Sequence, residues 1–153
     1  ADTVAEHGAK MVDLPLLLRE SDFVTLHSPL IPETRHMIGE TELQQMKSDA
    51  FLINAARGGL IDEDALYEAL TTGQISGAGV DVVEDVAPPL DHRLLQLKNL
   101  IVTPHTAFFS QEAVLELEER AAGEVARVFQ GQMPDNVINP TVLDHSRARL
   151  PAV

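Results

Sequence analysis

The sequence predicts an α/β fold built on a doubly wound parallel sheet. Short apolar runs alternate along the chain with segments of helical periodicity, as in strands joined by crossover helices. Capping and turn residues separate these segments, and no internal repeat or low-complexity tract competes with the pattern. We therefore expect parallel strands joined by right-handed crossovers, with helices on both faces of the sheet.

The expected strands are short runs rich in β-branched and other apolar residues. They are expected at residues 10–12, 23–26, 51–53, 75–83 and 100–102. The run at 75–83, ISGAGVDVV, has so little side-chain volume that backbone or ligand should approach closely at Gly77 and Gly79.

Helices are expected in the intervening segments, and most of them have a recognisable start or end. They are expected at residues 2–7, after Asp13, at 40–46, from Asp62 to Gly73 and at 111–130. Asp13, Asp62 and Ser110 can each cap a helix, and Gly8 and Gly73 can each end one. The buried faces are expected at Leu16, Leu17 and Leu18, at Ala65, Leu66, Ala69 and Leu70, and at Val114, Leu117, Ala121, Val125 and Val128.

Length and composition limit the possible classes of protein. The chain has 153 residues, 44% of them hydrophobic, which is enough for one core, and it has no cysteine for disulfides, thiolate zinc sites or a thiol nucleophile. A net charge of −13 argues against a nucleic-acid partner, because phosphate binding needs a basic face. With no apolar run long enough to cross a membrane and no signal peptide, we expect a cytoplasmic protein.

Ionisable residues follow several of the expected strands. Arg57 follows the run FLINAA, His27 follows 23–26, Asp81 lies near the end of 75–83, and His105 follows 100–102. The carboxyl ends of parallel strands meet at one edge of a sheet, where ligands collect. Each residue alone also has a structural explanation, such as a surface cation, a structural histidine or an aspartate that caps a loop.

Together these residues suit the oxidation of a 2-hydroxy acid. An arginine can bind a carboxylate through two parallel hydrogen bonds, which orients a small acid. A histidine that titrates near neutrality can exchange a proton with the substrate hydroxyl. No side chain accepts a hydride, so a nicotinamide cofactor is implied.

The same stretches resemble the D-2-hydroxyacid dehydrogenase family. The similar segments are SDFVTLHSPLIPETRHMIG, NAARGGLIDEDAL, GAGVDVVED and NLIVTPHTAFFS, which occur in the family's order and spacing over roughly residues 4–143. The stretch TPHTAFFSQEAV also resembles the branch that holds the C-terminal-binding corepressors, which bind NAD and act mainly in transcription.

The resemblance implies roles for individual residues. Arg57 matches the arginine that binds the substrate carboxylate, and His105 matches the general acid and base. Asp81 matches the aspartate that faces the nicotinamide amide. The residues implied to line the cofactor are His27, Pro29, Thr34, Ala55, Arg57, Asp81, His105 and Ala107.

One departure from the family concerns the partner of the histidine. The family's catalytic glutamate lies five positions after the aspartate, and that position is Val86. Glu84 and Asp85 are close by and are the alternatives for that role. Without a carboxylate partner, a general base loses its orienting bond, so we expect poor reduction of 2-keto acids.

A second departure concerns the dinucleotide site. The sequence has no G-x-G-x-x-G after a first strand and no acidic ribose ligand about twenty positions later. We therefore expect a partial Rossmann-like sheet that lacks its first two strands, in a fragment of a longer enzyme. NAD, with NADP as the alternative, is expected to bind weakly or not at all.

The expected organisation is a truncated NAD-binding domain at residues 1–132 and a tail at 133–153. The exposed edge of the 23–26 strand should favour a homodimer or other self-association. Three functions are compatible with the sequence: an oxidoreductase acting on a small 2-hydroxy or 2-keto acid, a catalytically impaired corepressor-like regulator, and an inactive structural fragment.

Overall fold

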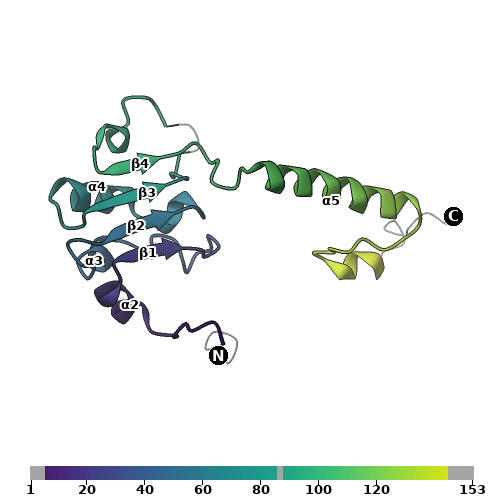
Figure 1. Cartoon of the computed structure of the whole chain (residues 1–153), viewed down its shortest axis with the longest axis horizontal. Coiled ribbons are helices and arrows are strands. Elements are labelled where there is room, and N and C mark those ends of the chain that lie inside the picture. Colours follow the sequence, from purple (N-terminus) through teal and green to yellow (C-terminus); the bar gives the residue numbers. More distant parts are fainter. Residues whose placement is uncertain (1–5, 86–87, 145–153) are drawn as a thin grey trace. The chain divides into compact units, whose positions relative to one another are not determined.

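The computed structural model describes residues 6–85 and 88–144 of the chain. The protein consists of two compact units, with the division between Ala107 and Phe108. Each unit is described by itself (Figure 1). The boundary predicted after residue 132 lies within the second unit and stays a prediction.

The first unit contains a four-stranded parallel sheet, which confirms the α/β class. Its strands are β1 (Phe23–Leu26), β2 (Phe51–Asn54), β3 (Gly77–Val80) and β4 (Leu100–Val102). Their order in the sheet is β1-β2-β3-β4, so neighbours in space are also neighbours in sequence (Figure 1). All pairs are parallel, with Phe23 opposite Phe51 and Phe51 opposite Gly77. The four carboxyl ends therefore lie along one edge.

Helix α2 (Leu14–Glu20) precedes the sheet, and α3 (Glu40–Leu43) connects β1 to β2. The 3₁₀ turn η1 (Gly58–Leu60) and α4 (Glu63–Thr71) lie between β2 and β3, and the 3₁₀ turn η2 (Arg93–Gln96) lies between β3 and β4. The predicted caps are confirmed: Asp13 Oδ1 accepts the Leu16 amide at 2.9 Å, and Asp62 Oδ1 accepts the Asp64 and Ala65 amides at 3.0 and 3.1 Å. A carboxylate in these positions also interacts favourably with the positive end of the helix dipole.

The core lies between the helices and one face of the sheet. Along β1 and β2 every second residue is buried, as the two-residue period of a strand requires. The strand residues Val24, Leu26 and Leu52 meet helix residues such as Leu18 and Leu66, each at most 6% exposed. Of the three leucines predicted to be buried in α2, only Leu18 is fully buried.

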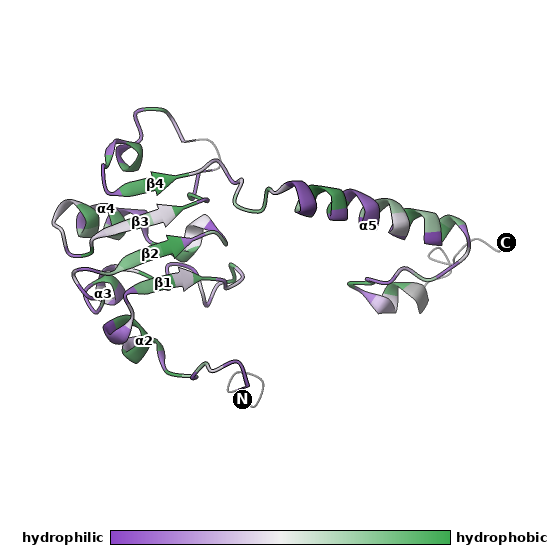
Figure 2. Ribbon diagram, viewed as in Figure 1, coloured by the Kyte–Doolittle hydropathy of each residue, from purple (hydrophilic) through white to green (hydrophobic). Residues whose placement is uncertain are grey.

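No described helix of this unit covers the other face of the sheet, so the expected second layer of helices is not found within the unit. Phe23 is 68% exposed, Phe51 41% and Ile101 72%. The rings of Phe23 and Phe51 stack on this face with their centroids 5.5 Å apart. Apolar colouring extends along β2 and β4 (Figure 2). All three helices form one layer, because α2 contacts α3 and α3 contacts α4.

Three predicted elements differ in extent. Residues 10–12 form no strand, because no described strand lies beside them to complete a ladder. The strand predicted at 75–83 is confined to β3, and the helix at 40–46 to α3. The helix predicted at 2–7 falls largely outside the described residues.

The glycines of β3 behave differently from one another. A Cβ on Gly77 would lie 2.9 Å from the Asn99 carbonyl oxygen and 3.1 Å from the Phe51 ring, so the predicted close approach is confirmed there. A Cβ on Gly79 would meet nothing within 4 Å, so no other backbone approaches closely there, and the approach of a ligand at Gly79 stays a prediction.

The second unit is built on one long helix, α5 (Gln111–Phe129), followed by the 3₁₀ turn η3 (Pro140–Asp144). The predicted cap is confirmed, since Ser110 Oγ accepts the Ala113 amide at 3.0 Å. Within its own unit α5 has no buried residue, and Leu117 and Val125 are 61% and 56% exposed, so the predicted buried face has no partner in this unit. No helix in the described parts of the chain is long and apolar enough to cross a membrane.

Candidate functional site

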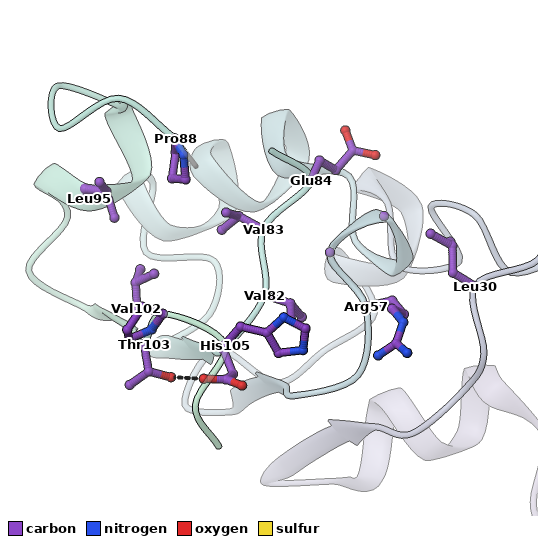
Figure 3. A pocket seen from close by; sticks show the side chains of 14 residues that line it. Leu30, Arg57, Val82, Val83, Glu84, Pro88, Leu95, Val102, Thr103 and His105 are labelled. Atoms are coloured by element: carbon purple, nitrogen blue, oxygen red, sulfur yellow. Dashed lines mark hydrogen bonds between the residues drawn. The ribbon is translucent and has the colours of Figure 1, made fainter. Parts of the chain in front are cut away.

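A cavity of about 530 Å³ lies at the carboxyl ends of the strands, and segments that follow all four strands line it (Figure 3). Its apolar wall consists of Leu30, Val82, Val83, Pro88, Leu95, Val102 and Pro104. Its polar lining consists of Arg57, Asp81, Glu84, Thr103 and His105, with Gly58 and Gly59. Such a mostly apolar pocket with a few polar groups is typical of small-molecule sites.

Arg57 lies in this cavity because the end of β2 is held in a tight loop. The side chain of Asn54, only 1% exposed, donates from Nδ2 to the Arg57 carbonyl at 2.9 Å and accepts the Ala56 amide at 3.1 Å. Among the residues that the structure describes, no carboxylate forms an ion pair with Arg57. The guanidinium donates to the Ala56 carbonyl at 2.6 Å, which leaves donors for an anion.

The glycine pair after Arg57 allows a close backbone contact. A Cβ on Gly58 would lie 2.2 Å from the carbonyl carbon and oxygen of Val83 and 2.6 Å from the Glu84 nitrogen. Any other residue would force the two segments apart. The motif Arg-Gly-Gly therefore places the arginine beside the segment that follows β3.

Asp81 organises the loop that follows β4. Its Oδ1 accepts Thr103 Oγ1 at 2.5 Å and the Thr106 amide at 2.8 Å, and its Oδ2 accepts the Ala107 amide at 2.9 Å. Burial opposes the charged form, but the hydrogen bonds from Thr103, Ala107 and Thr106 outweigh it and hold the pKa of Asp81 below its usual range. Asp81 is therefore a carboxylate that fastens the His105 loop.

His105 occupies the strained position of this loop. Its φ is +55°, a left-handed conformation that non-glycine residues rarely adopt, and its amide donates to the Asp81 carbonyl at 2.9 Å. The turn at His105 directs the next two amides to the Asp81 carboxylate. The imidazole of His105 points into the cavity on the side that faces Arg57 (Figure 3).

The remaining predicted site residues fall into two groups. His27 and Pro29 line a second, more open hollow of about 670 Å³, which shares Leu30 and Arg57 with the first cavity. Ala55, Ala107 and Thr34 line neither hollow. Thr34 holds its own loop instead, since Oγ1 donates to the Pro29 carbonyl at 2.6 Å.

The structure also locates one candidate replacement for the family glutamate. Val86 lies outside the described residues. The Glu84 carboxylate accepts hydrogen bonds from Arg35 at 2.8 Å and His36 at 2.9 Å, and it points away from His105 (Figure 3). Sequence reasoning missed Asn54, Thr103 and Gly58 as site-building residues. Asn54 and Gly58 lie within three positions of Arg57 in the sequence, and Thr103 lies two positions before His105. This proximity to the predicted site residues could have indicated their role.

The match to a family model decides the family. Residues 1–107 match the model described as D-isomer specific 2-hydroxyacid dehydrogenase, NAD binding domain. The chain belongs to this family. The matched range coincides with the first compact unit, so the NAD-binding domain of the D-2-hydroxyacid dehydrogenases accounts for the sheet and the cavity.

Curated relatives and solved structures agree with this assignment. A glyoxylate reductase of Korarchaeum cryptofilum is 44% identical over 93% of this chain and 43% of its own length. A glycerate dehydrogenase of Methylorubrum extorquens is 49% identical over 84% of this chain and 41% of its own length. The NAD complex of a D-isomer specific 2-hydroxyacid dehydrogenase from Lactobacillus delbrueckii is 33% identical, covering 87% of this chain and 44% of that one, with a TM-score of 0.81.

The chain thus spans less than half the length of these relatives. Their names are those of reductases and dehydrogenases. The predicted resemblance to the corepressor branch stays a prediction.

Proposed function

We propose that this chain supplies the carboxylate-binding and acid–base groups of an NAD-dependent oxidoreductase that interconverts a D-2-hydroxy acid and a 2-keto acid. The observation that supports this most is that Arg57 and His105, from the ends of different strands, line one cavity. A cation that binds a carboxylate and an imidazole that exchanges a proton are the two groups this chemistry needs from a protein.

Each residue has a defined part in the proposed reaction. Arg57 would bind the carboxylate of the acid with paired hydrogen bonds and so orient the neighbouring carbon. His105 would accept the hydroxyl proton during oxidation and return it to the carbonyl oxygen during reduction. Asp81 would keep the His105 loop in its strained conformation during both oxidation and reduction. NAD would supply the hydride acceptor or donor.

The residues present fit the nicotinamide part of such a cofactor. The apolar wall that Val82, Val83 and Val102 form beside His105 suits a flat ring and excludes water. The sequence contains no G-x-G-x-x-G turn for a pyrophosphate. Weak dinucleotide binding by this chain is therefore part of the proposal.

We propose the cofactor as a nicotinamide dinucleotide and the substrate as a class of small acids. An acyclic imino acid reductase solved with NADPH is 37% identical to this chain, with a TM-score of 0.76, so NADP stays an alternative to NAD. The curated relatives are named for glyoxylate, glycerate and phosphoglycerate, which share the 2-hydroxy or 2-keto acid but differ beyond it. A cytoplasmic homodimer stays a prediction from the sequence.

One observation favours a second function, that of a catalytically impaired NAD-binding regulator. The Glu84 carboxylate, one of the two alternatives for the family glutamate, accepts hydrogen bonds from Arg35 and His36 and points away from His105 (Figure 3). Val86 occupies the sequence position of the family glutamate. A histidine without that partner would be a slow general base.

A panel of 2-keto acids with NADH or NADPH tests the proposal. We expect slow reduction of glyoxylate or hydroxypyruvate by the protein, and a further loss of roughly 100-fold or more in Arg57→Gln or His105→Gln. Val86→Glu should raise the rate at least about tenfold. If the unaltered protein and the Val86→Glu variant both bind the cofactor but neither reduces a keto acid, the result would contradict the proposed oxidoreductase and favour the regulatory function.

A further inference from the structure

Glu84, through its carboxylate and its backbone amide, joins three segments beside the cavity. Its Oε1 accepts Arg35 Nη2 at 2.8 Å and His36 Nε2 at 2.9 Å, and both donors come from the segment between β1 and α3. The Glu84 amide donates to Glu63 Oε1, in the first turn of α4, at 2.6 Å. One residue therefore connects the segment after β3 to two other parts of the unit.

The loop that carries Arg57 passes between these segments. On one side, the His36 amide donates to the Gly59 carbonyl at 2.8 Å. On the other side, Gly58 packs against the Val83 and Glu84 backbone with no room for a Cβ. A Cβ on Gly59 would lie 3.3 Å from both Arg35 Nη1 and Glu84 Oε1, so the loop runs directly beside the ion pair.

We infer that Glu84 is a positioning residue, which together with Arg35 and His36 holds residues 57–60 in place and so fixes the backbone that carries the Arg57 guanidinium. Glu84 acts through the Arg57 loop. Only the identity of the anion that Arg57 binds rests on the proposed function; the positioning of the loop rests on the contacts themselves.

The arrangement is stronger than an ordinary surface ion pair. The side chains of Arg35 and Glu84 are 57% and 34% exposed, and a single pair at that exposure contributes little. Here one oxygen accepts two charge-assisted bonds, and the Glu63 carboxylate fixes the Glu84 backbone. His36 also lies 3.8 Å from Asp62, the N-cap of α4, and has a φ of +52°. Loss of the Glu84 charge should therefore loosen the Arg57 loop locally.

Amide hydrogen exchange in Glu84→Gln measures this loosening. The reporters are the amides of Leu60 and Ile61, which donate to the Arg57 and Gly58 carbonyls at 3.2 and 3.1 Å. We expect their exchange to accelerate roughly three- to fivefold, as for the loss of a charge-assisted contact that is partly exposed. The Ala78 amide, bonded to Asn99 across the sheet at 3.0 Å, should not change.

Two further variants make the measurement specific. Arg35→Gln removes the partner from an exposed position and should accelerate the same amides. Glu116→Gln removes the carboxylate of an exposed i,i+4 pair with Arg120 on α5, so it should leave exchange at Leu60 and Ile61 unchanged. Unchanged exchange at both reporters in Glu84→Gln and Arg35→Gln would overturn the inference, and so would equal acceleration at Ala78, because that indicates a global effect.

Titration with oxalate separates this inference from the proposed function. We expect Arg57→Gln to abolish binding and Glu84→Gln to weaken it roughly threefold, because the charge of Arg57 is retained but its position is less defined. Faster exchange at Leu60 and Ile61 in a protein that never binds oxalate would support the positioning role and contradict the carboxylate site. If the unaltered protein binds oxalate, equal affinity in Glu84→Gln would overturn the positioning role.

Discussion

Asp81 shows how one side chain holds the loop that carries His105. It is 6% exposed, a position that by itself disfavours a charged carboxylate. Three hydrogen bonds from the Thr103–Ala107 segment outweigh that penalty and keep the carboxylate ionised. The sequence suggested two roles for Asp81, a loop cap and a partner of the nicotinamide. The hydrogen bonds support the first, and the second stays a prediction.

Asp81→Asn should destabilise the protein in a pH-dependent way. The pKa of Asp81 lies below its ordinary value of 3.8, so its charge stabilises the fold above that pH and stops doing so as the pH falls through the folded-state value. We expect a loss of about 1–3 kcal/mol at pH 7, because an amide cannot accept all three hydrogen bonds. Urea unfolding between pH 2.5 and 7 should show the two proteins converging below pH 4; a constant difference would contradict the argument.

Gly58→Ala should be strongly destabilising because the new Cβ would overlap the Val83 backbone at 2.2 Å. We expect a cost of about 2–3 kcal/mol, at the upper end for overpacking, together with a displaced Arg57. Gly79→Ala is the matched control, since its Cβ would meet nothing within 4 Å. Chemical unfolding of both variants checks this, and a similar stability for the two would show that the close contact is not rigid.

At the scale of elements, caps and buried faces explain the helices of the first unit. Helix α4 begins at its Asp62 cap, buries Leu66, Ala69 and Leu70, and is followed by Gly73 at a φ of +72°. All of these features follow from local chemistry. The segment from β2 to α4 is therefore the part of the fold that the sequence describes best.

Asp62→Ala should weaken α4 by about 1 kcal/mol, because two first-turn amides would lose their acceptor. The expected result is a lower thermal midpoint. Glu68→Ala, on the exposed side of the same helix, should change stability by less than about 0.5 kcal/mol. Equal midpoints for both variants in calorimetry would show that the cap contributes nothing measurable.

At the scale of the whole molecule, each unit leaves an apolar surface open. In the first unit this is the sheet face with Phe23, Phe51 and Ile101; in the second it is the apolar side of α5. Patches of this kind favour association with another chain. Strand β1 also has only one neighbour in the described sheet, so its outer edge can add a strand.

We expect the protein to self-associate with rising concentration in sedimentation experiments, and Phe23→Lys to weaken that association by about tenfold. Met11→Lys is the control, since Met11 is 73% exposed and lies outside the sheet. A monomer that is independent of concentration, or equal effects of the two substitutions, would show that the open sheet face is not the interface.

The sequence predicted the parts of the fold that depend on neighbouring residues. Strands β1 and β4 occur at the predicted residues, and α5 begins after Ser110 as expected. Predictions failed where a distant partner decides the outcome. Residues 10–12 have strand-like composition but no neighbouring described strand, and α5 has a helical stripe of apolar residues that nothing within its own unit buries.

For the candidate site, the sequence by itself determined which chemical groups stand at the strand ends and which family the motifs resemble. Only the tertiary structure decided that Arg57 and His105 line one cavity, that the Asp81 carboxylate holds the His105 loop, and that Glu84 is bonded to Arg35 and His36. Residue types and caps are local properties of the chain. Cavities and hydrogen bonds between segments up to 49 positions apart depend on how the strands are ordered, and composition does not encode that order directly.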